Sequence, residues 1–192
     1  MKVVFLDFDG VLNSNIFVLD PKQKAPFFLE DDKMLLLKNI IEKTNAKIVL
    51  STSWREVWNT ELSVSKQLKD YFDSFDIEVY DVTKCVNYHR PSEIKEWLAR
   101  HDVSHYVILD DIIDPWDGLD AHVVTTNLDG QGLTEALALQ AIQLLNDSIL
   151  ASNITLNPDD KFCQGVFVPY GITYDDNVET ERTGGFGSTG KQ

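Results

Sequence analysis

Short apolar segments alternate with amphipathic ones along most of the chain, and this alternation restricts the fold more than any other feature. The stretches KVVFLDF (2–8), AKIVL (46–50) and HYVILDD (105–111) are nearly continuous in apolar residues, as buried parallel strands are. IEVYDV (77–82) and AHVVTT (121–126) are shorter strand candidates. Strands that alternate with helices predict an α/β fold, with a Rossmann-like parallel sheet flanked by helices.

Two of the segments between these strands have the residue spacing of helices. DDKMLLLKNIIEKTNA, from Asp31, places Leu35, Ile40 and Ile41 at helical spacing behind an aspartate cap. A single amphipathic helix is expected over about 56–72.

Two further helices follow in the second half of the domain. RPSEIKEWLARH has Pro91 near its first turn, where a missing backbone N–H costs nothing. LTEALALQAIQLLND, from Leu133, is the closing helix, with Thr134 as its expected N-cap. After this helix the pattern changes to isolated apolar stretches and a polar, glycine-rich end. We therefore expect one domain over 1–147 and a separate tail over 148–192.

Composition limits the classes of function. The 192 residues are 43% hydrophobic, which suits one α/β domain with a packed core. The N-terminal apolar run is broken by acids, so it predicts neither a signal peptide nor a membrane span. Cys85 and Cys163 match no zinc spacing and favour a reducing cytoplasm. The net charge of −14 opposes non-specific adhesion to nucleic acid or anionic membranes.

Polar side chains follow the three most apolar strands where each strand ends. Asp7 and Asp9 follow the first, residues 51–53 (Ser-Thr-Ser) follow the second, and Asp110 and Asp111 follow the third. Open parallel sheets bind their ligands at this edge. Four carboxylates in one crevice repel one another unless a cation neutralises them, and hard oxygen ligands suit Mg²⁺. The sequence therefore predicts a magnesium site at the carboxyl edge of the sheet.

The motifs FLDFDGVLN, IVLSTSWR, HRPSEIKEWL and VILDD together resemble those of the haloacid dehalogenase (HAD) superfamily of phosphohydrolases. The stretches STSWR and DGQGLTEALALQAIQLL look most similar to the small HAD domains found alone or within RNA-repair proteins. The resemblance implies a HAD-type fold and Mg²⁺ as cofactor. No independent cap domain fits between the motifs, so we expect a minimal cap or none. The loop NIFVLDPKQKAPFF (15–28) is the candidate lid.

The resemblance implies a role for each polar residue. Asp7 would be the nucleophile that forms an aspartyl-phosphate, and Asp9 would protonate the leaving oxygen and then activate water. Thr52 would hydrogen-bond the phosphoryl group, or Ser51 if the register differs by one residue. Ser53 is a further candidate for binding the phosphate.

The remaining roles concern the metal and its surroundings. Asp110 would bind Mg²⁺ beside Asp7 and the backbone carbonyl of Asp9, and Asp111, or Asp114 through water, would complete the shell. Gly10, directly after Asp9, is another candidate for the phosphate site.

One cation is expected before the next helix, where it would stabilise negative charge on the phosphoryl oxygens. The family usually has Lys there, and Arg90 fits the local pattern best, with Lys84 and Lys95 as competitors. A guanidinium can bind phosphate oxygens in pairs, so Arg is a plausible substitute but not an equivalent one.

Three residues after the second strand are assigned structural roles. Trp54 and Trp58, four apart, are expected to pack, with a place at the mouth of the substrate site as the alternative. Arg55 is expected at the surface, and contact with phosphate is its alternative role.

The glycine-rich end of the chain contains most of a Walker A phosphate loop, from Gly185 to Lys191. A working loop of that type needs a preceding strand, a following helix and a Ser or Thr after the lysine. Gln192 follows Lys191 instead, so we do not expect a P-loop.

Residues 159–191 instead resemble the C-terminal arm of trimeric dUTPases. The positions that in that family contact the nucleotide are matched here by Phe186, Arg182, Ser188 and Thr189. The chain carries no segment with that family's water-activating Asp or uracil-binding hairpin, so we expect no dUTPase activity from it. The tail is either a remnant or an arm that closes over the HAD site.

Together the patterns predict a Mg²⁺-dependent phosphomonoester hydrolase that acts on nucleotides or other small phosphorylated metabolites. A homo-oligomer is compatible with this assignment, and a membrane partner is not expected. One alternative is a non-catalytic HAD-like binding module or a dUTPase-associated partner. Another is a phosphatase for nucleic-acid ends, which the lack of a visible basic stripe disfavours.

Overall fold

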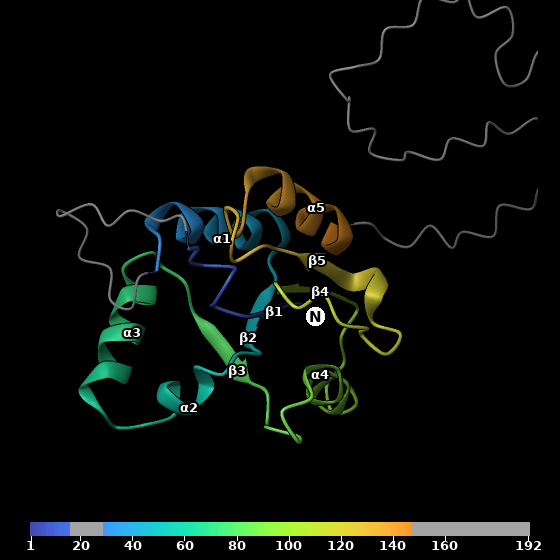
Figure 1. Cartoon of the computed structure of the whole chain (residues 1–192), viewed down its shortest axis with the longest axis horizontal. Coiled ribbons are helices and arrows are strands. Elements are labelled where there is room, and N and C mark those ends of the chain that lie inside the picture. Colours follow the sequence, from blue (N-terminus) through green and yellow to red (C-terminus); the bar gives the residue numbers. More distant parts are fainter. Residues whose placement is uncertain (16–28, 147–192) are drawn as a thin grey trace, which may run out of the picture. The chain divides into compact units, whose positions relative to one another are not determined.

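The computed structural model describes residues 1–15 and 29–146, and these form a five-stranded sheet with helices on both faces (Figure 1). The strands are β1 Lys2–Leu6, β2 Lys47–Leu50, β3 Val79–Val82, β4 His105–Asp110 and β5 Val123–Thr125. Their order in the sheet is β3-β2-β1-β4-β5, and every neighbouring pair is parallel. The predicted α/β class with a Rossmann-like parallel sheet is confirmed.

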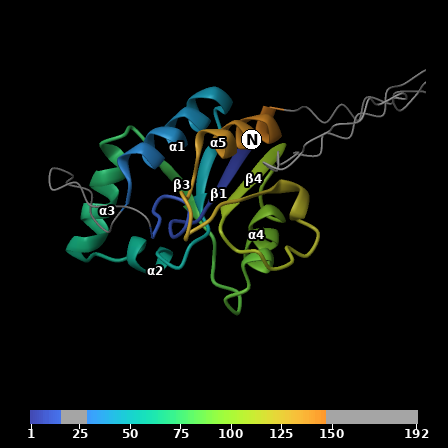
Figure 2. The same cartoon turned by 45° about the horizontal axis from the view of Figure 1, so that its top comes forward.

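Helices cover both faces of this sheet. They are α1 Asp31–Thr44, α2 Arg55–Trp58, α3 Ser63–Asp73, α4 Arg90–Leu98 and α5 Glu135–Asn146. A short 3₁₀ helix, η2, precedes β5 at Asp120–His122. In both cartoon views α1 and α5 lie side by side on one face, and α4 lies on the other (Figure 2). No helix among the described residues is long and apolar enough to cross a membrane.

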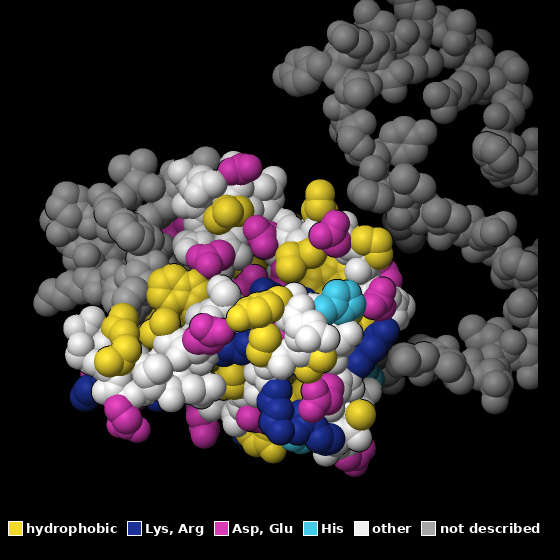
Figure 3. Space-filling model, turned by 60° about the horizontal axis from the view of Figure 1, so that its bottom comes forward, with side chains coloured by type: hydrophobic (Ala, Val, Ile, Leu, Met, Phe, Trp, Pro, Cys, Tyr) yellow, Lys and Arg dark blue, Asp and Glu magenta, His cyan; other side chains and the backbone are white. Residues whose placement is uncertain are grey.

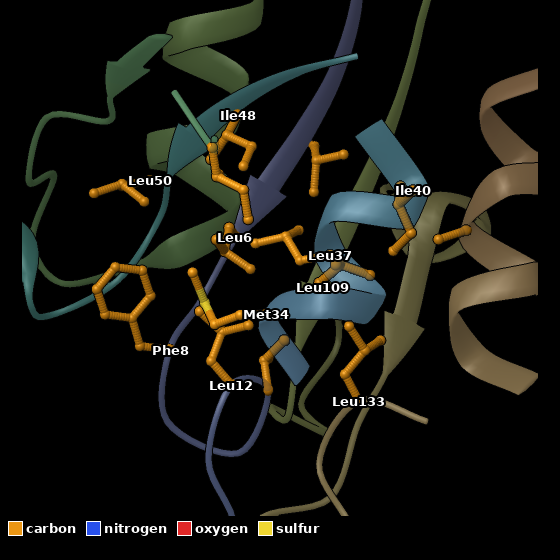
Figure 4. Packing of buried hydrophobic residues seen from close by; sticks show 14 of the residues in the cluster. Leu6, Phe8, Leu12, Met34, Leu37, Ile40, Ile48, Leu50, Leu109 and Leu133 are labelled. Carbon is orange, nitrogen blue, oxygen red and sulfur yellow. The ribbon is translucent and has the colours of Figure 1, made fainter. Parts of the chain in front are cut away.

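The larger core lies between the sheet and helices α1, α3 and α5. Leu6, Leu50 and Leu109 project from three neighbouring strands toward Met34 and Leu37 of α1, and all five side chains are fully buried (Figure 4). Burial of this kind contributes about 1.5–3 kcal/mol for each large apolar side chain. This core holds the strands in register up to their carboxyl ends.

A smaller core lies between the sheet and α4. Phe5 and Ile108 project to this face, and the ring of Phe5 meets that of Trp97 edge to face at a centroid distance of 5.4 Å. Successive strand residues point to opposite faces. Asp7 and Asp110 each lie two residues beyond these apolar positions, so the alternation directs both carboxylates toward the α4 side.

The predicted helix over 56–72 is wrong, because the chain breaks it into α2 and α3. Asn59 and Thr60 follow α2, and the Thr60 hydroxyl donates to the Val57 carbonyl at 2.8 Å, an alternative to continuing the helix. Leu62 then has an extended backbone immediately before α3.

Two details of α1 also differ from the prediction. Its apolar face is formed by Met34, Leu37 and Ile40, whereas Leu35 is 58% exposed. Its N-cap residue is Glu30, which makes no side-chain capping bond, and the expected aspartates lie in the first turn.

At α5 the predicted cap is confirmed. The Thr134 hydroxyl accepts the backbone N–H of Leu137 at 3.3 Å.

Several predictions concern residues that the structure does not describe. The candidate lid lies there apart from Asn15, and so does the whole of the predicted tail. The four positions that resemble a dUTPase arm, Phe186, Arg182, Ser188 and Thr189, also lie outside the described residues.

Candidate functional site

The candidate site lies where β1 and β4 end side by side. After β1 the chain goes on to β2, which lies beside β1 on the side away from β4. After β4 it goes on to β5, which lies beside β4 on the side away from β1. The two connections therefore leave in opposite directions. Open α/β sheets bind their ligands at the position where the strand order reverses in this way. The backbone N–H of Asp7 still pairs with the carbonyl of Leu109 at 3.0 Å, so the two strand ends are held together up to the site.

Three carboxylates gather at this point. Oxygens of Asp7, Asp110 and Asp111 all lie within 4.8 Å of one another, and the first two residues are buried. One oxygen of Asp7 accepts the N–H of Phe8 at 2.8 Å, and one oxygen of Asp110 accepts the N–H of Ile112 at 3.0 Å. These bonds fix both side chains and leave the second oxygen of each carboxylate, Oδ2, directed at the shared site.

Arg90 supplies a positive charge to this cluster from the first residue of α4. Its Nη1 lies 3.0 Å from Oδ2 of Asp7 and also donates to Oδ2 of Asp110. Burial opposes the charge on the guanidinium, but the carboxylates of Asp7 and Asp110 outweigh it and raise the pKa of Arg90. Of the two competitors, Lys95 is exposed and donates to the backbone carbonyl of Asp117, and Lys84 is also exposed.

The negative charge of the three carboxylates exceeds the positive charge of Arg90, so the cluster can accept a further cation. Burial raises the pKa of Asp110 to about 7, Arg90 opposes that shift, and the neighbouring Asp7 reinforces it. Burial and the charge of Asp7 likewise raise the pKa of Asp111. One guanidinium does not neutralise three close carboxylates, and such an oxygen donor set suits a hard divalent ion such as Mg²⁺. The residues present therefore fit a metal of this kind.

Gly10 is required by the packing of the site. Its φ is +71°, and a Cβ placed on it would lie 2.5 Å from Oδ2 of Asp111. Only glycine adopts this backbone freely and leaves space for that carboxylate. The N–H of Gly10 donates to Oδ1 of Asn13 at 2.9 Å, which closes the turn after β1.

Asp9 lies apart from the three clustered carboxylates. Its Oδ1 accepts the side-chain amide of Asn13 at 2.9 Å, and its Oδ2 accepts the indole N–H of Trp54 at 2.8 Å. Sequence reasoning assigned Trp54 to packing, and its ring does pack beside Phe8. The hydrogen bond to Asp9 was missed, and the signal available was the position of Trp54, directly after the three polar residues that follow β2.

The three hydroxyl residues after β2 differ in their surroundings. Oγ of Ser51 is buried and has no hydrogen-bond partner among the described residues. The hydroxyl of Thr52 accepts the backbone N–H of Trp54 at 3.2 Å and is also buried. Ser53 is exposed and lines an open pocket. The structure thus places an unpaired buried hydroxyl at Ser51, the second choice of the sequence analysis.

A family model described as "HAD domain in Swiss Army Knife RNA repair proteins" matches residues 3–138. The chain belongs to this family. The matched range contains every predicted site residue from Asp7 to Asp111 and places the domain in a superfamily of hydrolases and phosphatases. The resemblance of the tail to dUTPases lies beyond this range and stays a prediction. Searches of curated proteins and of solved structures found no match.

Arg55 of this HAD domain is buried, so its predicted place at the surface is wrong. Its guanidinium forms two hydrogen bonds with the carboxylate of Glu93 in α4, at 2.6 and 2.9 Å. Glu93 also accepts the N–H of Val86, and Arg55 reaches the hydroxyl of Thr83 at 3.4 Å. This pair links the β2–α2 turn to the helix that begins with Arg90.

Two pockets open beside Arg90. The larger, of about 320 Å³, is lined by Ser53, Arg55, Glu56, Tyr88, Arg90 and Glu93. The smaller, of about 150 Å³, is lined by residues 88–91, 112 and 114–116. Tyr88 and Arg90 line both pockets. The two pockets therefore adjoin each other at the end of the loop between β3 and α4.

Proposed function

We propose that this HAD domain is a Mg²⁺-dependent phosphomonoester hydrolase that acts through an aspartyl-phosphate on Asp7. The observation that carries the proposal is the contact of Asp7 with Arg90 beside two further carboxylates. Asp7 is oriented by a backbone N–H and by a guanidinium, which favours one fixed direction of attack.

In the first step an oxygen of Asp7 forms a bond to phosphorus while the bond from phosphorus to the ester oxygen breaks. The leaving oxygen takes a proton from Asp9. In the second step water attacks the same phosphorus, Asp9 takes a proton from that water, and the bond to Asp7 breaks to release inorganic phosphate. Asp7, Asp110, Asp111 and the carbonyl of Asp9 would hold Mg²⁺, which when bound offsets the negative charge of the phosphoryl oxygens.

The chain's own residues would set the conditions for these steps. Arg90 would bind phosphoryl oxygens next to Asp7, where its charge acts in a partly dry site. The carboxylate of Asp9 accepts the side-chain N–H groups of Asn13 and Trp54, so these two residues would orient Asp9 for both proton transfers.

We also propose Ser51 as the hydroxyl that donates to the transferring phosphoryl group. A buried hydroxyl without a partner costs free energy, and a phosphate oxygen would satisfy it. Thr52 is the alternative. Ser51→Ala and Thr52→Ala, compared in kcat/KM, separate the two, and a larger loss for Thr52→Ala would reject this assignment.

The substrates we propose are nucleotides or other small phosphomonoesters. A second candidate, a phosphate at the end of an RNA or DNA strand, is favoured by the RNA-repair context of the family. On the face of the described residues that Figure 3 displays, Lys and Arg side chains form small groups beside acidic ones, with no continuous basic stripe. That distribution and the net charge of −14 favour contact with one terminal nucleotide rather than with a long strand.

The test is phosphate release from nucleoside monophosphates, an aryl phosphate and end-phosphorylated oligonucleotides, with Mg²⁺ or with EDTA. The wild type is compared with Asp7→Asn and with Asp73→Asn, an exposed acid of α3 that serves as control. Activity that requires Mg²⁺, disappears in Asp7→Asn and persists in Asp73→Asn supports the proposal. If no substrate releases phosphate, the proposal fails and the non-catalytic binding module becomes the better explanation.

A further inference from the structure

The larger pocket beside Arg90 has the size and position of a subsite for the group that carries the phosphate. Its volume of about 320 Å³ lies at the lower end of the range for ligand pockets, about 300–1,000 Å³. Arg90 lines this pocket and also contacts Asp7, so the pocket begins where the phosphoryl group would be held. The leaving group of a bound phosphomonoester would extend into it.

Tyr88 is the aromatic side chain of this pocket. It is 82% exposed and lines both pockets. Among the described residues it has no stacking partner, whereas the rings of Phe5, Trp58 and Phe72 are all paired within the cores. An exposed aromatic face at the mouth of a phosphate site is available to a planar ligand.

The backbone that presents this ring is strained. Asn87 and Tyr88 have φ values of 53° and 56°, two consecutive non-glycine residues in the left-handed region. L-residues adopt this region at a cost in free energy, which is smaller for Asn than for a bulky residue such as Tyr. The exposed ring of Tyr88 does not recover that cost by packing. Strain that the surrounding structure maintains without a gain in packing is typical of binding sites.

The loop is nevertheless well anchored. The carboxylate of Glu93 accepts the N–H of Val86 at 3.1 Å and is itself held by Arg55, and the N–H of His89 donates to the carbonyl of Val86 at 3.0 Å. The ring of Tyr88 is therefore presented from a fixed turn, which lowers the entropic cost of binding a ligand against it.

The charges in the pocket favour an uncharged group with hydrogen-bonding edges. Arg55 and Glu93 neutralise each other, and Arg90 lies against the carboxylates of the site, where it would bind the phosphoryl group rather than the group that carries it. The hydroxyl of Ser53 and the carboxylate of Glu56 remain on the exposed wall and can bond to hydroxyl or amino groups. A nucleoside, with a planar base and a ribose, matches this combination.

We infer that the pocket lined by Ser53, Glu56 and Tyr88 binds the nucleoside of a phosphorylated nucleoside substrate, with the base stacked on Tyr88. This inference rests on the proposed phosphatase function. It narrows the proposed substrates from small phosphomonoesters in general to phosphorylated nucleosides. Stacking on Tyr88 acts on the leaving group alone, so it lowers KM for nucleotides and leaves phosphoesters without an aromatic group unaffected.

The experiment compares KM and kcat for a nucleoside monophosphate and for glycerol phosphate, in the wild type, Tyr88→Ala and Tyr88→Phe. Tyr80→Ala, at a half-exposed tyrosine of β3, is the matched control. Tyr88→Ala should raise KM for the nucleotide about tenfold, the effect of losing one base-stacking contact, with glycerol phosphate unchanged. Tyr88→Phe should resemble the wild type, because it keeps the ring. An equal change for both substrates, or none for the nucleotide, would overturn the inference.

A binding measurement separates failure of the inference from failure of the proposed function. Calorimetric titration of a nucleoside monophosphate into Asp7→Asn, with and without Tyr88→Ala, requires no turnover. Affinity that depends on Tyr88 supports the subsite even if the wild type hydrolyses neither substrate, in which case only the proposed function fails. Affinity that is unchanged by Tyr88→Ala, or no binding at all, rejects the subsite.

Discussion

The buried ion pair between Arg55 and Glu93 gives the most quantitative test of this structure. Glu93→Gln keeps the shape of the side chain and removes its charge. The two side chains are 8% and 1% exposed and meet through two hydrogen bonds of 2.6 and 2.9 Å. After the substitution the guanidinium of Arg55 stays buried without its counter-ion, and the amide offers it only one acceptor.

Removal of one partner from a buried pair costs about 3–5 kcal/mol. Because the substituted amide would retain one acceptor, we expect the lower end, about 3 kcal/mol, out of the roughly 5–15 kcal/mol that stabilises a domain of this kind. With a urea dependence of about 1–3 kcal/mol per molar, the unfolding midpoint should fall by about 1–3 M.

The assay is urea unfolding of the full chain followed by tryptophan fluorescence. Glu96→Gln is the matched control, since Glu96 lies on the same helix but forms an exposed pair with Arg100 at 3.5 Å. That pair should contribute well under about 1 kcal/mol. Equal midpoints for Glu93→Gln and Glu96→Gln would refute the reasoning. A double variant, Arg55→Met with Glu93→Met, should be more stable than either single one, because both charges are then gone.

Three further predictions concern the site and the pH range of stability. Gly10→Ala should lower the free energy of unfolding by about 1–3 kcal/mol and weaken Mg²⁺ binding, since the new Cβ would lie 2.5 Å from an oxygen of Asp111; thermal unfolding with and without Mg²⁺ measures both effects. Trp54→Phe keeps the ring but removes the N–H bonded to Asp9, so kcat should fall about tenfold in a phosphate-release assay. Burial raises the pKa of Tyr71 above its ordinary 10.0, so the folded state retains this proton more strongly and stability should fall as pH rises above about 10; urea unfolding across that range should show a shallower fall for Tyr71→Phe.

Each of these has a control or a contrary outcome. Gly118→Ala meets no atom within 4 Å although its φ is +87°, so it should share the backbone strain and leave Mg²⁺ binding unchanged. Trp58→Phe alters a tryptophan that packs on Phe72 and should leave kcat at the wild-type level. Parallel pH curves for the wild type and Tyr71→Phe would show that another group controls stability at high pH.

The sequence was informative where short-range patterns carry the signal. The positions of the five strands follow from runs of apolar residues, and the alternation along β1 and β4 directs Asp7 and Asp110 to the same side. It was less informative at helix boundaries. The predicted long helix breaks after Trp58 because local hydrogen bonds of Thr60 compete with the helix.

The sequence by itself determined the strand and helix alternation, the α/β class and the set of acids placed at the strand ends, because burial and backbone geometry repeat over a few residues. Only the tertiary structure decided which side chains meet: Trp54 with Asp9, 45 positions apart, and Arg55 with Glu93, 38 positions apart. It also favoured Arg90 over the nearby lysines, since that choice depends on how α4 packs against the ends of β1 and β4. Contacts of this kind arise from the packing of whole elements, and no local period in the chain encodes them.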